Sequence, residues 1–230
     1  MLLNLLIVLN FFNFQSDKSV EKKDTLVYGI DISNHQGIID WDKVKSWEGN
    51  PIQFIYIKAT EGATFQDKSY NKNVTGAKAN NYKIGSYHYF KTSSSPKDQF
   101  DNFKKTIDLQ KQDLIPVVDV EEINRHFTSS FHKNLKEFLV LVEKHCGTKP
   151  IIYSFNAFYN KHLAHKYKEY RFIIGRYGVE EPIMADKGNW HIWQFTDKAS
   201  IEGISKKVDL NVLNTQIATA HLYLTRISSK

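Results

Sequence analysis

The sequence predicts a single α/β domain, a (β/α) barrel whose late helices are shortened or missing. From Leu26 onward, short apolar runs alternate with longer amphipathic stretches, which is typical of parallel strands joined by crossover helices. Eight candidate strands follow one another before residue 211, and the last ones are too close together for full helices. No glycine-rich nucleotide-binding motif follows the first strand, so a closed barrel is favoured over an open doubly wound sheet.

The individual elements follow from the spacing of apolar residues. Four helices are expected between the early strands, at 40–47, 70–81, 95–109 and 131–146. Ser95 before Pro96 is typical of a helix start, and Gly147 is typical of a helix end. The expected strands are rich in β-branched and aromatic residues, and they are 27–32, 54–59, 83–90, 115–120, 150–155, 171–177, 190–195 and 206–210.

The composition narrows the class of partner. Lys and Arg total 31 against 25 Asp and Glu, a net charge of +6 that favours polyanionic partners such as nucleic acid, anionic lipid or an anionic cell wall. Aromatic residues make up 13% of the chain, which suits a large core or a carbohydrate-binding cleft. The one cysteine, Cys146, excludes an internal disulfide and is expected to be a buried helix residue rather than a nucleophile.

The N-terminal segment looks like an export signal. Residues 1–16 are apolar and carry no charged side chain, and a polar stretch follows up to residue 24. We therefore expect a signal-like segment and spacer at 1–24, the barrel at 25–215 and a short extension at 216–230. The expected location is outside the cell, in the periplasm or in the cell envelope. The alternative is an uncleaved membrane anchor; otherwise no stable membrane partner is expected.

Acidic residues gather where the expected strands end, and functional side chains of a (β/α) barrel lie at these ends. Asp119 and Glu121 are two residues apart on one strand, so they face the same way. Their mutual repulsion raises the pKa of at least one carboxyl group, which suits a general acid of a glycosidase. A solvated acidic strand end or a metal-binding pair would give the same short motif.

Other polar and aromatic residues share these strand ends, and each has an ordinary structural explanation. A single strand histidine such as His88 is more often a core residue than a base, and the aromatic residues can pack in the barrel or stack on sugars. The nine histidines show no metal-ligand spacing beside acidic partners, so no metal is expected. No basic helix is interleaved with aromatic residues, so nucleic acid is not expected as a partner.

Five motifs occur in order along the chain. They are YGIDISNHQG with IDW at 28–41, FIYIKATEG at 54–62, GSYHYF at 85–90, PVVDVE at 116–121, and WQF at 193–195 with VDLN at 208–211. Together they resemble the glycoside hydrolase family 25 lysozymes, the muramidases of bacteria, phages and fungi. The resemblance covers about residues 28–214.

The resemblance implies a flattened β/α barrel that cleaves the β-1,4 bond between N-acetylmuramic acid and N-acetylglucosamine in peptidoglycan, as a monomer without a cofactor. Glu121 would be the general acid and base. Asp119 would stabilise the developing charge or orient the 2-acetamido group. The implied mechanism is retaining, through neighbouring-group participation or a covalent aspartyl intermediate. Residues expected to contact the substrate are Asp31, Lys58, Glu61, Tyr87, His88, Tyr153, Tyr177, Trp193, Gln194 and Asp209.

Two alternative functions remain open from the sequence. The first is a catalytically silent barrel that binds glycans, although all four acids that the resemblance assigns to the groove are present. The second is a glycosidase with another substrate such as chitin. Chitinases carry alternating aspartates before the catalytic glutamate, whereas Val117 and Val118 precede Asp119 here.

Overall fold

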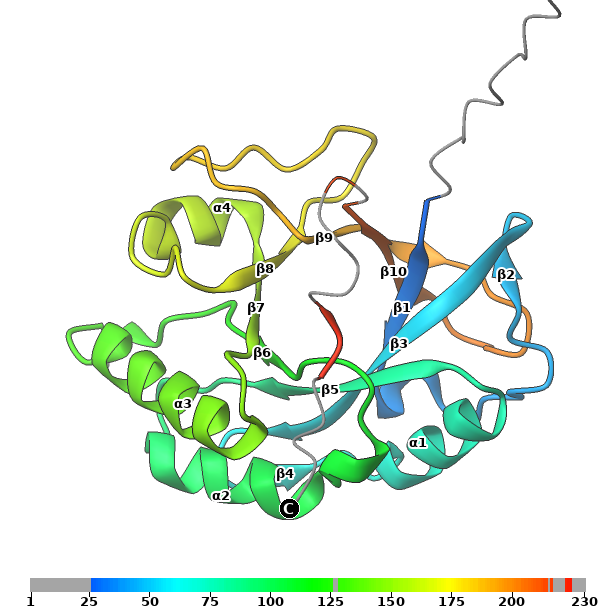
Figure 1. Cartoon of the computed structure of the whole chain (residues 1–230), viewed down its shortest axis with the longest axis horizontal. Helices are drawn as coiled ribbons and strands as arrows, with labels where there is room; N and C mark the ends of the chain where they lie inside the picture. Colours follow the sequence, from blue (N-terminus) through cyan, green and yellow to red (C-terminus); the bar gives the residue numbers. More distant parts are fainter. Residues whose placement is uncertain (1–25, 126–127, 215, 217–221, 225–230) are drawn as a thin grey trace, which may run out of the picture.

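The computed structural model describes residues 26–125, 128–214, 216 and 222–224, and within them eight strands form a closed barrel (Figure 1). The signal-like segment 1–24 and most of the extension 216–230 lie outside these residues. Each of the eight expected strands has a counterpart, which confirms the barrel prediction. The strands, in order around the barrel, are β1 Tyr28–Ile32, β3 Asn50–Glu61, β5 Lys83–Tyr89, β6 Val117–Asp119, β7 Ile151–Phe155, β8 Arg171–Gly175, β9 Ile192–Ala199 and β10 Val208–Leu213, which returns to β1.

The last strand corrects the expectation of a parallel sheet. Neighbouring strands from β1 through β3 to β9 are parallel, but β10 is antiparallel to both β9 and β1. The connection from β9 to β10 is a hairpin loop, 200–207, and an antiparallel return needs no crossover helix. The beginning of β10 therefore lies at the same rim as the ends of the other strands.

The helices cover one part of the barrel. α1 Tyr70–Ala79, α2 Pro96–Thr106 and α3 Phe131–Cys146 lie along the lower part of Figure 1, with α2 and α3 next to each other and α1 apart from them. α4 Asn156–Phe158 and the π-turn Tyr159–Leu163 are short, as expected for the late helices. Ser95 caps α2 by accepting a hydrogen bond from the Asp98 N–H, and Gly147 ends α3 at a φ of 73°, a conformation that favours glycine. No helix in the described part of the chain is long and apolar enough to cross a membrane.

The prediction of a helix at 40–47 is wrong. This segment forms turns that lead into the short strand β2 Ser46–Trp47, which pairs with β3, as does the other short strand, β4 Phe65–Gln66. Trp41 and Val44 are three residues apart, as on one face of a helix, but here both side chains are buried without a helix. The backbone is instead held by a hydrogen bond from the Asp40 N–H to the Gly203 carbonyl, 2.9 Å long.

Two apolar cores hold the strands from opposite sides. One lies between the sheet and the helices, and it includes Ile55, Phe103 and Leu139. The other lies inside the barrel, beneath the rim where the strands end, and consists of inward-facing residues. Its members from the strands are Phe54, Tyr56, Val117, Ile151, Tyr153, Ile173, Ile192 and Leu213. The strand positions near the site are therefore fixed by packing on both faces.

A short C-terminal segment closes the floor of this inner core. Leu222 is buried among the inward-facing residues, and its carbonyl accepts a hydrogen bond from the Ile115 N–H, 2.9 Å long. Tyr223 forms a β-bridge with Leu114. The described part of the extension is thus part of the barrel's packing.

Gly76 gives a test of how α1 packs on the barrel. A Cβ at this position would lie 2.2 Å from Cδ1 of Trp41. Gly→Ala in a helix normally stabilises by about 1 kcal/mol, but overpacking costs about 1–3 kcal/mol. We expect Gly76→Ala to lower the free energy of unfolding in urea denaturation, whereas Thr75→Ala, on the exposed side of the same helix, should change it little. A stabilised Gly76→Ala would contradict this packing.

Candidate active site

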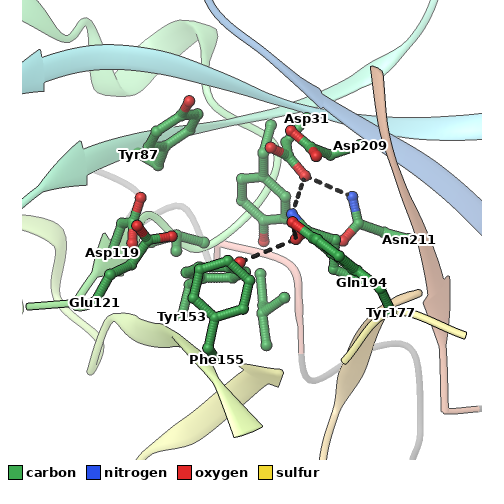
Figure 2. A pocket seen from close by; sticks show the side chains of 13 residues that line it. Asp31, Tyr87, Asp119, Glu121, Tyr153, Phe155, Tyr177, Gln194, Asp209 and Asn211 are labelled. Atoms are coloured by element: carbon green, nitrogen blue, oxygen red, sulfur yellow. Dashed lines mark hydrogen bonds between the residues drawn. The ribbon is translucent and has the colours of Figure 1, made fainter. Parts of the chain in front are cut away.

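A cavity of about 150 Å³ opens at the rim where the strands end, and residues from all eight barrel strands or their ends surround it (Figure 2). Four of the lining side chains are carboxylic acids and three are tyrosines that the sequence predicted. The full lining is Asp31, Tyr56, Tyr87, Val117, Asp119, Glu121, Tyr153, Phe155, Ile173, Tyr177, Gln194, Asp209 and Asn211. The structure thus brings together eight of the sequence-predicted site residues.

Asp119 and Glu121 lie side by side on one wall of this cavity, as their spacing predicts (Figure 2). The backbone is held in place by hydrogen bonds from the Phe90 N–H to the Asp119 carbonyl and from the Val120 N–H to the Tyr153 carbonyl, both 2.9 Å. Asp119 is only 9% exposed, and its Oδ1 has no hydrogen-bond partner among the described residues. One acceptor atom in the cavity is therefore left open.

The electrostatics of this pair favour retention of a proton. Burial, and then the charge of Asp31, raise the pKa of Glu121 to about 7, against the opposing charge of Lys58. Burial, followed by the charge of Glu121, raises the pKa of Asp119 well above its usual value. Because the two groups repel each other, the pair gives up its protons in two linked steps.

Asp31 and Asp209 form a second carboxyl pair on the opposite wall. They are directly paired in the antiparallel register of β1 and β10. Asp31 Oδ2 accepts hydrogen bonds from Asn211 Nδ2 at 2.8 Å and from Gln194 Nε2 at 2.9 Å. Burial and the charge of Asp31 raise the pKa of Asp209 to about 9, so Asp209 holds a proton beside a partner that accepts two amide hydrogen bonds. Metal binding is not indicated in the described part of the chain, where no group of three or more His, Cys, Asp or Glu is arranged to hold an ion.

A chain of hydrogen bonds extends from Asp31 through Gln194 to two tyrosine hydroxyl groups. The hydroxyl groups of Tyr153 and Tyr177 both donate to Gln194 Oε1, at 2.9 and 3.2 Å. The amide nitrogen of Gln194 donates to Asp31 on its other side. Tyr153 also acts on Glu121, because it lowers the pKa of that carboxyl group. Asp31 is thus linked to both tyrosines through the buried Gln194 side chain.

Lys58 and Glu61 lie beside the cavity rather than in its lining. Lys58 Nζ lies 2.8 Å from Glu61 Oε2, and Lys91 Nζ contacts Glu61 at 3.2 Å and Glu122 at 3.4 Å. Lys58 is near enough to oppose the rise in the pKa of Glu121 and of Asp119. Lys58 thus places a positive charge beside an otherwise acidic cavity.

His88 and Trp193 lie outside the cavity, contrary to the expectation that they contact the substrate. Strand alternation turns Tyr87 and Gln194 inward and their neighbours outward. His88 is fully buried, its Nδ1 lies 2.7 Å from Thr60 Oγ1, and its ring stacks on Phe138. Trp193 donates its indole N–H to the Arg176 carbonyl at 2.7 Å and packs against Trp190 on the outer surface. In this structure His88 and Trp193 are packing residues.

Sequence reasoning missed five lining residues, although the period of the strands could have found three of them. Tyr56 comes two residues before Lys58, Phe155 two after Tyr153, and Asn211 two after Asp209, so each faces the same way as its predicted neighbour. Val117 and Ile173 form the apolar floor of the cavity. No polar signal marks these two in the sequence.

A closed β/α barrel with buried carboxyl pairs at its functional rim has the construction of a glycoside hydrolase. The chain belongs to the glycosyl hydrolases family 25, whose sequence model matches residues 30–204. This match confirms the resemblance carried by the motifs. The chain is therefore a glycoside hydrolase of the lysozyme, or muramidase, type.

The similarity to individual proteins covers most of the chain. The chain is 36% identical over 203 residues to protein YegX of Escherichia coli K12, covering 87% of this chain and 74% of YegX. It is 32% identical to an autolytic lysozyme of Clostridium acetobutylicum, covering 80% of this chain and 54% of that protein. The structure of a family 25 glycosyl hydrolase from Bacillus anthracis matches with a TM-score of 0.73 at 31% identity, covering 81% of this chain and 88% of that one.

The raised pKa of Asp209 predicts how stability varies with pH. The folded chain keeps this proton up to about pH 9, whereas the unfolded chain loses it near pH 4. Between these values the folded state binds one more proton, so the free energy of unfolding falls as pH rises. We expect Asp209→Asn to reduce this fall between pH 5 and pH 8 in urea denaturation. Asp101→Asn, on the exposed face of α2, is the matched control; equal slopes for wild type and Asp209→Asn would contradict the assignment.

Proposed function

We propose that this enzyme hydrolyses peptidoglycan at the β-1,4 bond between N-acetylmuramic acid and N-acetylglucosamine, with Glu121 as general acid and base and Asp119 as the assisting carboxylate. The observation that carries the proposal is the pair itself: two buried carboxyl groups on one wall of a single cavity, one with a pKa of about 7. Support for the substrate comes from the family and from relatives named as lysozymes.

Glu121 has the protonation behaviour that the first chemical step needs. A carboxyl group with a pKa of about 7 is about half protonated at neutral pH and can give its proton to the leaving glycosidic oxygen. The resulting carboxylate then takes a proton from water in the second step. Burial is the largest cause of the shift, so the same cavity that excludes water also prepares the acid.

Asp119 is suited to act on the sugar rather than on the leaving group. Its open Oδ1 could accept the N–H of a 2-acetamido group, which would orient the acetamido oxygen toward the anomeric carbon. Its charge would also stabilise an oxocarbenium-like transition state. Both the neighbouring-group route and the covalent route use this carboxyl group.

The remaining lining side chains form the sugar-binding wall in this proposal. Asp31, Asp209 and Gln194 offer polar atoms, and Tyr87, Tyr153 and Tyr177 offer rings and hydroxyl groups. Lys58 and Glu61 border the same groove. The enzyme is proposed to act as an exported monomer; the apolar segment 1–16 and the net charge of +6, which suits an anionic wall, support this part.

Peptidoglycan and chitin assayed side by side separate this function from its alternatives. We expect the purified protein to clear a suspension of peptidoglycan and to release reducing ends from it, with little release from chitin. Equal or greater release from chitin would contradict the proposed substrate. Binding to peptidoglycan without release of reducing ends would instead support the glycan-binding barrel.

Replacement of the acid tests its role directly. Glu121→Gln keeps the shape but removes the transferable proton, so turnover on peptidoglycan should fall by about 10²–10⁴-fold while binding is largely kept. Glu122→Gln, which changes the next and more exposed carboxylate, is the matched control and should stay close to wild type. A Glu121→Gln enzyme with near-normal turnover would rule out this assignment.

A further inference from the structure

The outer side of β9 and β10 lacks the helical cover of the earlier strands. α1 and α2 pack on β3, but no α-helix in the described part of the chain follows α4. The side chains of β9 that point away from the cavity therefore reach the surface, and two of them, Trp193 and Phe195, are aromatic and partly exposed. A groove of about 310 Å³ lies along this outer wall.

Five aromatic side chains form a continuous row in the groove. The ring centroids of Trp190 and Trp193 lie 6.2 Å apart. Phe195 lies 5.6 Å from Trp193 on one side and 5.6 Å from Trp47 on the other. Tyr28 on β1 lies 5.8 Å from Trp47 and 6.3 Å from Phe195. The row is built by the fold, because its members come from three strands and a loop.

Hydrogen bonds hold one end of this row in place. Trp193 donates its indole N–H to the Arg176 carbonyl at 2.7 Å, and the Arg176 guanidinium donates to the Glu181 carbonyl at 2.8 Å. The side-chain amide of Asn214 donates to the Trp190 carbonyl at 3.0 Å. These rings are therefore fixed before any ligand arrives, which lowers the entropic cost of binding.

The groove is almost without charge, although 24% of the whole chain is charged. Glu181 is the one charged side chain among the described residues that line it, so the groove does not suit a phosphate group or an anionic lipid. Trp47 and Trp190 donate their indole N–H groups to no described residue, and the exposed amide of Gln216 lies in the same groove. Aromatic faces with a few free polar groups suit a neutral sugar, whose C–H face stacks on a ring while its hydroxyl groups form hydrogen bonds.

We propose that this aromatic groove is a second glycan-binding site, which holds a stretch of N-acetylated glycan strand outside the catalytic cavity. The inference rests on the proposed function, because it takes the substrate to be a polymer of such sugars. The catalytic cavity of about 150 Å³ is smaller than the roughly 300–1,000 Å³ of pockets that enclose a whole small molecule. Most of a polymeric glycan therefore lies outside it.

The groove and the cavity lie on opposite faces of the same wall. On β9, Gln194 faces the cavity and Trp193 faces the groove. The loop that follows β8 borders both sites, through Tyr177 at the cavity and Glu181 at the groove. A glycan strand bound in the groove thus keeps the cavity close to neighbouring strands of the same polymer, which raises their effective concentration.

The indole N–H signals in an NMR spectrum report on the groove directly. The probe is soluble glycan strands of peptidoglycan without stem peptides, added to the ¹⁵N-labelled full chain carrying Glu121→Gln. The chain has four tryptophans, and we expect saturable shifts of the Trp47 and Trp190 signals. Trp41, which is buried against α1, is the internal reference and should not shift. Unchanged Trp47 and Trp190 signals at saturating glycan would overturn the proposal.

Replacement of one ring separates the groove from the cavity. Trp190→Leu keeps an apolar side chain but removes the ring, so the Kd of the Glu121→Gln chain for insoluble peptidoglycan should rise by about 2–10-fold in a sedimentation assay. Trp47→Leu serves the same purpose if the first variant does not fold. Val179→Ala is the matched control, because Val179 is apolar, 97% exposed and outside the groove. Equal Kd values for the folded ring variant and this control would contradict the proposal.

Other occupants of the groove would give different results. Shifts of the Trp47 and Trp190 signals with vesicles of phosphatidylglycerol and phosphatidylethanolamine, but not with glycan strands, would assign the groove to a membrane surface. Shifts that depend only on protein concentration would assign it to a second copy of the chain. Either result would overturn the proposal.

Failure of the proposed function is distinguishable from failure of this inference. If the wild-type chain did not cleave peptidoglycan but its glycan strands still shifted the Trp47 and Trp190 signals, the proposed function would fail and the second site would stand. If the chain cleaved peptidoglycan and these signals did not move, only the second site would be ruled out.

Discussion

Four carboxyl groups lie together in the mouth of a closed barrel, and the cost of burying their charges constrains everything around them. A buried carboxylate needs donors, a retained proton or a nearby cation. Asp31 has the amide donors, Asp209 keeps a proton, and Lys58 offsets part of the shift at Glu121. Asp119 differs, because its Oδ1 has no partner among the described residues. The carboxyl group with the fewest hydrogen bonds is therefore the one assigned to the sugar.

The same strands serve the site and the stability of the fold. On β5, Tyr87 faces the cavity while His88 packs under α2 and α3 against Phe103 and Phe138. On β9, Gln194 faces the cavity while Trp193 packs on the outside. Because Tyr87 and Gln194 each have a packed, outward-facing neighbour, these strands are held by side chains on both faces of the sheet. Tyr87 and Gln194 thus reach the cavity from strands, whereas Glu121 and Tyr177 reach it from the segments that follow β6 and β8.

The sequence was sufficient for the eight strands and for the Asp119–Glu121 pair, because both depend on a period of two and on local apolar runs. It was not sufficient for His88 and Trp193. The period shows that neighbours face opposite ways, but which one faces inward depends on how the barrel closes. The direction of β10 was missed for a similar reason, since a hairpin and a crossover differ in tertiary pairing. At 40–47, the buried residues Trp41 and Val44 have the spacing of a helix face. The segment forms turns instead, held by the hydrogen bond from Asp40 to Gly203, which is distant in the sequence.

The antiparallel return of β10 has an evolutionary consequence. Asp209 enters the cavity from the first part of its strand, directly after the hairpin loop 200–207, and Asn211 follows on the same face. If β10 slipped by one residue against β1, Leu210 would point into the cavity and both polar side chains would turn away. The loop is itself held in place, because Ile201 and Ile204 are buried and the Gly203 carbonyl accepts a hydrogen bond from the Asp40 N–H. Within β10 itself, a single inserted codon would remove one wall of the site, so this strand should tolerate substitutions far better than changes in length.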